Sequence, residues 1–145
     1  MPGWEQSTGG DRNPEPVIVY RALAEEDSIR LENGFPISAK APDGIWTAAE
    51  HVSNASSDPL LTGRASKNSP WISTSRIYDV AEGYNSGNGI AIIDLNKVNS
   101  FKTEVWRHAP RVNGELGLPY HRSIWAQEVT IYLEIPKSAI IEVEK

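Results

Sequence analysis

Apolar positions along the chain form short runs that are typical of β-strands. Val17–Tyr20 and Ile90–Leu95 are apolar and rich in β-branched residues, so both segments predict buried strands. Residues 126–134 alternate between an apolar face and a face that carries Glu128, Thr130 and Tyr132. Further strands are predicted over 35–39, 71–74, 98–106 and 140–143.

Three segments have the spacing or the end residues of helices. Leu23–Asn33 has an acidic first turn and is followed by Gly34, which suits the left-handed conformation that ends many helices. A second helix is predicted over residues 46–53. The apolar residues over 77–84 follow helical spacing, and Ser75 is expected to cap that helix. We therefore predict an α+β sandwich, with its helices mainly in the N-terminal half, rather than a doubly wound sheet.

Composition divides the chain into a tail and one domain. Residues 1–16 are polar and rich in Gly and Pro, which predicts a flexible tail or a linker from a larger protein. Residues 17–145 predict one compact domain, and the polar segments 54–70 and 108–121 are expected to be loops. A chain of 145 residues that is 39% hydrophobic can bury a core of its own.

Charge and residue usage exclude several functional classes. The net charge of −5 argues against a protein that holds nucleic acid mainly through its phosphates, although transient contact with RNA or DNA as a substrate stays open. The chain has no cysteine, and its three histidines lie far apart, so no metal site is expected. No apolar run approaches the length of a membrane span and no signal peptide is evident, which predicts a soluble domain without membrane insertion.

Candidate chemistry lies at three places far apart in the sequence. Glu128 begins an apolar strand, Arg21 follows the first strand, and Ser73-Thr74-Ser75 ends a strand in the middle of the chain. These residue types can bind a phosphorylated sugar and stabilise a glycosyl cation. Each also has an ordinary structural interpretation: a solvated edge charge, a surface ion pair, and a strand end that leads into a helix cap.

The order of these residues resembles the mono-ADP-ribosyltransferase fold of bacterial toxins, a split β-sandwich. More narrowly, segments 69–75, 86–95 and 127–130 resemble the C-terminal toxin domains of bacterial Rhs and contact-dependent polymorphic proteins, over residues 17–141. Such enzymes use NAD as a substrate: they cleave its nicotinamide–ribose bond and pass ADP-ribose to an acceptor. The transition state is expected to resemble an oxocarbenium ion, as in glycoside hydrolysis.

The resemblance implies roles for individual residues. Glu128 matches the catalytic glutamate, Arg21 is expected to hold phosphate or ribose oxygens, and Ser73 to orient Glu128 or the nicotinamide ribose. Further residues are expected around NAD: Tyr20, Thr74 and Tyr84, with Tyr78 as an alternative to Tyr84 for stacking on nicotinamide. Thr74 is also expected to point toward the core. His51 is expected to be a satisfied surface group.

One position departs from the family pattern. Arginine- and guanine-modifying members carry Glu or Gln two residues before the catalytic glutamate, where this chain has Ala126. Strand alternation would place Gln127 on the opposite face from Glu128. The acceptor is then chosen by another element, or water is the acceptor. Arg107, Arg111 and Arg122, which flank segment 108–121, are either solvated or meet the acceptor.

Three functions remain open at this stage. The favoured function is a mono-ADP-ribosyltransferase toxin that acts on a protein or RNA. The alternatives are an NAD glycohydrolase toxin that depletes NAD, and a non-catalytic binding module of the same fold. The resemblance also implies delivery into the cytoplasm of a target cell as part of a larger secreted protein, and a cognate immunity protein that covers the site.

Overall fold

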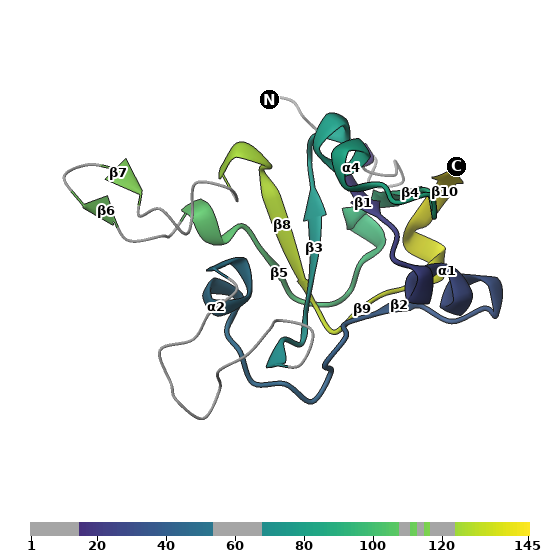
Figure 1. Cartoon of the computed structure of the whole chain (residues 1–145), viewed down its shortest axis with the longest axis horizontal. Coiled ribbons are helices and arrows are strands. Elements are labelled where there is room, and N and C mark those ends of the chain that lie inside the picture. The colour runs from purple at the N-terminus through teal and green to yellow at the C-terminus, as the bar shows by residue number, and fades with distance from the viewer. Residues whose placement is uncertain (1–14, 54–67, 108–110, 113–114, 117–123) are drawn as a thin grey trace, which may run out of the picture.

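The protein has an α+β architecture dominated by one antiparallel sheet (Figure 1). A computed structural model describes residues 15–53, 68–107, 111–112, 115–116 and 124–145. The six-stranded sheet has the order β10-β4-β1-β3-β8-β5. Its strands are β1 (Ile18–Ala22), β3 (Trp71–Ser75), β4 (Ile90–Asp94), β5 (Lys102–Thr103), β8 (Glu128–Tyr132) and β10 (Ile140–Glu144). Two short ribbons accompany it: β2 (Ile37–Ser38) with β9 (Glu134–Ile135), and β6 (Arg111–Val112) with β7 (Glu115–Leu116).

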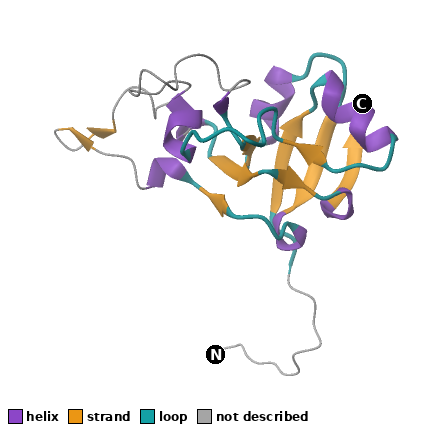
Figure 2. Cartoon of the chain, turned by 90° about the horizontal axis from the view of Figure 1, so that it is seen from below, coloured by secondary structure: helices purple, strands orange, loops and turns teal. Residues whose placement is uncertain are grey.

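The helices are short and lie around the strands (Figure 2). They are α1 (Glu25–Glu32), α2 (Ala48–Ser53) and α4 (Tyr78–Tyr84). The end of α1 is as predicted: Gly34 has a φ of 83°, and the amide of Phe35 donates to the carbonyl of Arg30 at 2.8 Å. This is the hydrogen-bond pattern of a glycine-terminated helix. None of the helices formed by the described residues has both the length and the apolar character needed to cross a bilayer.

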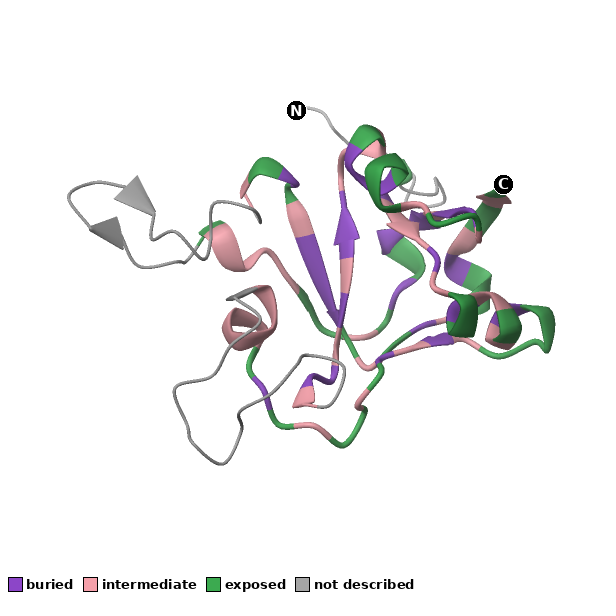
Figure 3. Cartoon of the chain, in the orientation of Figure 1, coloured by how far each residue is buried: buried purple, intermediate pink, exposed green. Residues whose placement is uncertain are grey.

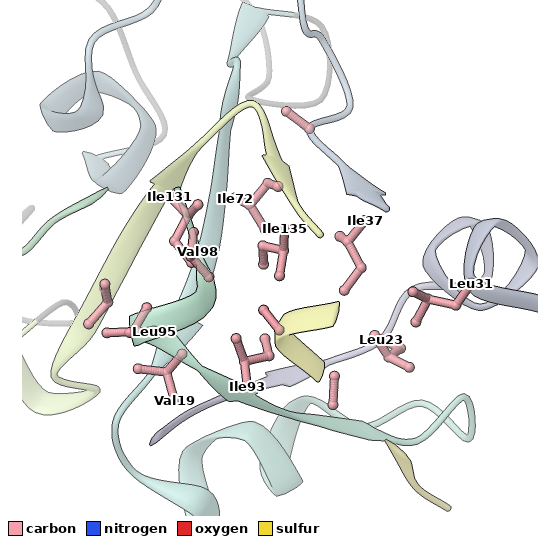
Figure 4. Close-up of a cluster of buried hydrophobic side chains, with 14 residues drawn as sticks. Val19, Leu23, Leu31, Ile37, Ile72, Ile93, Leu95, Val98, Ile131 and Ile135 are labelled. Atoms are coloured by element: carbon pink, nitrogen blue, oxygen red, sulfur yellow. The ribbon is translucent and has the colours of Figure 1, made fainter. Parts of the chain in front are cut away.

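The hydrophobic core packs between the large sheet and the β2–β9 ribbon (Figure 4). Val19, Ile93 and Ile131 come from the sheet, and Ile37 and Ile135 come from the ribbon; all five are fully buried. Burial therefore fixes the ribbon against one face of the sheet. The opposite face of β3 and β8 carries polar side chains. The middle of β8 is buried, whereas Ser73 in the middle of β3 is half-buried (Figure 3).

The strand predicted over 126–134 is two strands that belong to different sheets. Leu133 has a φ of 66° and separates β8 from β9, so the chain leaves the large sheet and pairs with β2. Its amide donates to the carbonyl of Pro70 at 2.8 Å, and its carbonyl accepts from the amide of Ala39 at 2.8 Å. Alternation could not reveal this break, since it records side-chain polarity and not backbone conformation. Within β8 the predicted faces are confirmed: Val129 and Ile131 lie in the core.

Other predicted elements differ at their ends. The strand predicted over 98–106 is confined to β5, because a 3₁₀ turn forms at Val105–Arg107. The predicted cap by Ser75 is wrong: Ile77 is the N-cap of α4, and no side chain caps it. Ser75 instead accepts from the amide of Ile77 at 2.9 Å and donates to the carbonyl of Ala126. Much of predicted loops 54–70 and 108–121, and most of tail 1–16, lie outside the described residues.

Candidate functional site

The six-stranded sheet opens between β1 and β3. Each of these strands forms five residue pairs with its other neighbour, whereas the register between them pairs one residue of each, Tyr20 with Ser75. A cavity of about 440 Å³ lies at this opening. Its lining includes Tyr20, Arg21, His51, Ser73, Thr74, Tyr84, Ala126 and Glu128. The fold thus brings together all six residues predicted from the sequence as site residues.

Glu128 is the carboxylate of this site. Its Oε2 atom accepts two hydrogen bonds, from Ser73 Oγ at 2.9 Å and from Thr130 Oγ1 at 3.0 Å. Burial raises the pKa of Glu128, while the two hydroxyls and the nearby charge of Arg21 act in the opposite direction. Among the described residues, no hydrogen bond reaches Oε1. One oxygen is therefore fixed by the protein and the other is available to a ligand.

Arg21 bridges the opening between the two strands. Its Nη1 donates to the carbonyl of Ser73 at 2.9 Å, where a continuous sheet would have a backbone hydrogen bond. Its Nε and Nη2 lie 3.1 and 3.0 Å from Oδ2 of Asp27, a residue with 3% of its surface exposed. The guanidinium of Arg21, which was expected to bind a ligand, is thus largely engaged by the protein. A ligand can reach only the remaining N–H groups.

Asp27 is a site residue that sequence reasoning missed. The same Oδ2 atom accepts from the amide of Ala24 at 2.8 Å, so Asp27 both caps the start of α1 and holds Arg21. The acidic first turn of α1 is visible in the sequence and is typical of a helix start. A local pattern explains why an acid stands near a helix start, but it does not show that an arginine is also its partner.

His51 was expected to be a satisfied surface group: its ring is satisfied as expected, but it is half-buried and lines the cavity. Its Nε2 atom lies 2.7 Å from Ser73 Oγ, and its Nδ1 atom lies 2.6 Å from Ser69 Oγ. Burial, and then the charge of Arg21, lower the pKa of His51 to about 4, so the ring is neutral at physiological pH. Nothing in the local sequence of α2 indicated this role, because both partners lie at least 18 residues away.

Arg21, His51 and Ser73 also form a wall shared with a second cavity of about 270 Å³. Lys40 also lines this second cavity. Two cationic side chains therefore face the same space. Lys40 is 44% exposed, and its nitrogen lies 3.9 Å from an oxygen of Glu26, at the outer limit of an ion pair.

The hydroxyl of Thr74 is engaged in the sheet. Thr74 has 4% of its surface exposed and donates to the carbonyl of Val129 at 2.7 Å. It lines the cavity, but its side-chain donor is used. Its burial agrees with the expectation that it serves the core.

The cavity is lined by Tyr84 and not by Tyr78. Tyr84 is 63% exposed and projects from α4. Tyr78 packs its ring edge against Tyr20, with 5.4 Å between ring centroids, and its hydroxyl bonds Glu144. That hydrogen bond is the main cause that raises the pKa of Tyr78 to about 12. Of the two tyrosines considered for stacking, Tyr84 is the one placed to meet a ligand.

The residues before Glu128 form a turn and not a strand. Gln127 has a φ of 45° and an exposed side chain, so the strand alternation used to place it does not apply. Ala126, two positions before the carboxylate, nevertheless lines the cavity.

The arginines expected to meet an acceptor are only partly described. Arg107 is exposed; its Nε lies 3.2 Å from Oε1 of Glu104, and its guanidinium lies over the ring of Trp106. Arg111 begins β6, and Arg122 lies outside the described residues. In the described part of the chain, no three His, Cys, Asp or Glu side chains gather as a set that could hold a metal ion.

Comparison with known proteins places the chain in a family. The match covers residues 15–145 and is to the family described as "Domain of unknown function (DUF7587)". No curated protein matches the chain. Because the match spans nearly the whole sequence, this protein is a member of the DUF7587 family.

Proposed function

We propose that this protein is an NAD-dependent mono-ADP-ribosyltransferase. The observation that carries the proposal is the half-buried Glu128 carboxylate, which is held through Oε2 by two hydroxyls and lines a cavity beside Arg21. A cavity of about 440 Å³ is within the usual range for small-molecule sites. The opening of the sheet between β1 and β3, with a small ribbon packed on one face, supports an ADP-ribosyltransferase-like split sandwich.

In this proposal, Glu128 stabilises the cation that forms on the ribose. The bond between ribose C1′ and the nicotinamide nitrogen breaks, and its electron pair leaves with nicotinamide. The ribose 2′-hydroxyl donates to Oε1 of Glu128, the oxygen with no hydrogen bond from the described residues. The acceptor then bonds to C1′ and releases its proton to water. A fixed negative charge beside a developing cation lowers the barrier more in a buried site than in water.

The second cavity is lined by two cationic residues, which suit the phosphates of NAD. Arg21 and Lys40 both line the second cavity, and Arg21 also lines the first. The nicotinamide ribose then lies by Glu128, with Tyr84 positioned to stack on the nicotinamide ring. Since Asp27 fixes the guanidinium, Arg21 contributes its remaining N–H groups without having to order its side chain on binding.

An NAD glycohydrolase is the second candidate, and Ala126 favours it. The methyl group of Ala126 cannot hydrogen-bond a macromolecular acceptor, and in this candidate function water is the acceptor instead. A role as a toxin, delivery as part of a larger secreted protein, and a cognate immunity protein that covers the cavity belong to the same proposal and rest on the sequence resemblance.

The test is to incubate the protein with labelled NAD and whole-cell lysate. Glu128→Gln is the inactive variant, and Glu134→Gln, at an exposed glutamate of β9, is its matched control. Label that protease removes identifies a protein acceptor, and label that nuclease removes identifies RNA. Nicotinamide release without any labelled acceptor identifies the glycohydrolase. NAD binding without cleavage identifies a binding module, and absence of binding contradicts the proposal.

A further inference from the structure

Four side chains form one hydrogen-bonded row that ends at the candidate catalytic carboxylate. Ser69 lies before β3, His51 on α2, Ser73 on β3, and Glu128 on β8. The successive distances are 2.6 Å from Ser69 Oγ to His51 Nδ1, 2.7 Å from His51 Nε2 to Ser73 Oγ, and 2.9 Å from Ser73 Oγ to Glu128 Oε2.

The carboxylate sets the direction of every bond in this row. An ionised carboxylate can only accept, so Ser73 must donate its single hydroxyl proton to Glu128. Ser73 Oγ must then accept from His51, which requires the proton of the neutral imidazole to be on Nε2. His51 Nδ1 accepts from the hydroxyl of Ser69 in turn, and Ser69 Oγ accepts the amide of Trp71 at 3.1 Å.

We propose that His51 is a positioning residue: as its Nε2–H tautomer it holds the Ser73 hydroxyl toward Glu128 Oε2 and so keeps Oε1 directed at the substrate. The inference rests on the proposed function for its effect on catalysis. Both ring nitrogens are engaged by serines, so His51 does not act as a general base on the acceptor. Its contribution is to the orientation of Glu128 and not to proton transfer.

The alternative is that His51 only packs α2 against the sheet. Removing the imidazole would then change stability without a specific effect on Ser73. The two roles differ in three measurable ways: the tautomer of the ring, the dependence of its effect on Ser73, and the response to a side chain that restores one N–H donor.

The first experiment does not need activity. Nitrogen NMR of the imidazole in the wild-type protein at pH 7 is expected to show the Nε2–H tautomer of His51, and Ser73→Ala is expected to shift its Nε2 resonance. The Nδ1–H tautomer, or an Nε2 resonance that Ser73→Ala leaves unchanged, would overturn the inference.

The second experiment is a double-mutant cycle on NAD cleavage. His51→Ala is expected to lower kcat by roughly tenfold or more, the scale of one lost hydrogen bond, with KM little changed. His51→Gln, whose amide can still donate toward Ser73, is expected to retain most of the rate. In a Ser73→Ala background, His51→Ala is expected to have little further effect.

Independent, additive effects of the two substitutions would overturn the positioning role, as would a His51→Ala protein with wild-type kcat. If the wild type cleaves no NAD, the proposed function fails, while the tautomer measurement still decides whether the hydrogen-bonded row exists. Melting temperatures of all variants separate loss of fold from loss of orientation, and the tautomer measurement on the wild type and Ser73→Ala decides the inference if His51→Ala does not fold.

Discussion

Ser73 and Glu128 bond diagonally across two neighbouring strands, with Ser73 Oγ 2.9 Å from Glu128 Oε2. In the strand register Ser73 is opposite Thr130, and Glu128 is opposite Ser75. Diagonal neighbours on one face of an antiparallel pair are within reach of longer side chains. Thr130, on the same face as Glu128, bonds the same oxygen at 3.0 Å. The sheet register therefore places two hydroxyls at one carboxylate oxygen, and no hydrogen bond from the described residues reaches the other.

Glu128→Gln is expected to lower the rate of NAD cleavage by on the order of 100-fold or more, because it removes the charge that stabilises the cation. The measurement is nicotinamide release by the purified variant. Glu134→Gln, the exposed control, should retain the wild-type rate. A Glu128→Gln protein that cleaves NAD at the wild-type rate would contradict the proposed function.

The same substitution is expected to stabilise the fold at neutral pH. Because burial raises the pKa of Glu128 in the folded state, that state binds the proton more tightly than the unfolded chain does. Wild-type stability is therefore lost as pH rises through the raised pKa, and the amide removes this loss. Thermal unfolding should show Glu128→Gln melting above the wild type at pH 7, with a smaller difference near pH 4. An equal difference in melting temperature at both pH values would contradict a raised pKa of Glu128 in the folded state.

Arg21→Lys is expected to weaken NAD binding roughly tenfold although the positive charge is kept. A lysine ammonium cannot bond Asp27, the Ser73 carbonyl and a ligand with the geometry of a planar fork. Calorimetry in the Glu128→Gln background measures affinity without turnover. Arg76→Lys is the matched control, since Arg76 makes a two-point ion pair with Glu104 and is absent from the cavity lining. If the two variants bound NAD with equal affinity, Arg21 would not contribute to NAD binding.

Asp27→Asn is expected to lower the free energy of unfolding by about 3 kcal/mol, because it leaves a largely buried arginine without its counter-ion. The loss also weakens the cap at the start of α1. Urea unfolding at pH 7 measures the effect. Asp79→Asn, an exposed residue in the first turn of α4, should change stability little. Comparable losses in both variants would show that the Arg21 ion pair is not the cause.

His51 is expected to make the protein sensitive to acid. Its pKa is about 4 in the folded state and 6.5 in the unfolded chain, so protonation favours unfolding as pH falls from 6.5 to 4. The full effect, reached below pH 4, is about 3 kcal/mol. Urea unfolding across this pH window should show a steeper loss for the wild type than for His51→Gln. Parallel curves would mean that His51 titrates normally in the folded protein.

The acceptor is expected to be recognised away from Ala126. Small guanidino compounds such as agmatine should be poor acceptors, because a methyl group offers no hydrogen bond to the incoming group. Neutralising Arg107, Arg111 and Arg122 together should reduce transfer to the macromolecular target more than it reduces NAD hydrolysis, since binding loops on rigid scaffolds commonly select the partner. An RNA target would add a loss that depends on salt. Efficient labelling of agmatine, or equal loss of both reactions, would contradict this expectation.

Local sequence patterns were sufficient to predict which residues share a face of a strand. Alternation placed Glu128 and Thr130 together, and opposite to the core residues Val129 and Ile131, because side chains of a strand point to alternate sides. Local patterns also predicted the end of α1 at Gly34, where a left-handed backbone costs glycine no steric strain. Both properties depend on near neighbours in the chain.

Contacts between groups far apart in the chain could not be predicted from such patterns and depend on the packing of the whole domain. The side chain of Ser73 hydrogen-bonds His51, 22 residues away, and Glu128, 55 residues away. Arg21 bonds Asp27 on the next helix and the carbonyl of Ser73, 52 residues away. The break between β8 and β9 at Leu133 also depends on distant residues, because its φ of 66° is maintained by hydrogen bonds to Pro70 and Ala39. A local pattern records the polarity of a side chain and not its partner, which is set by the packing of strands and helices against one another.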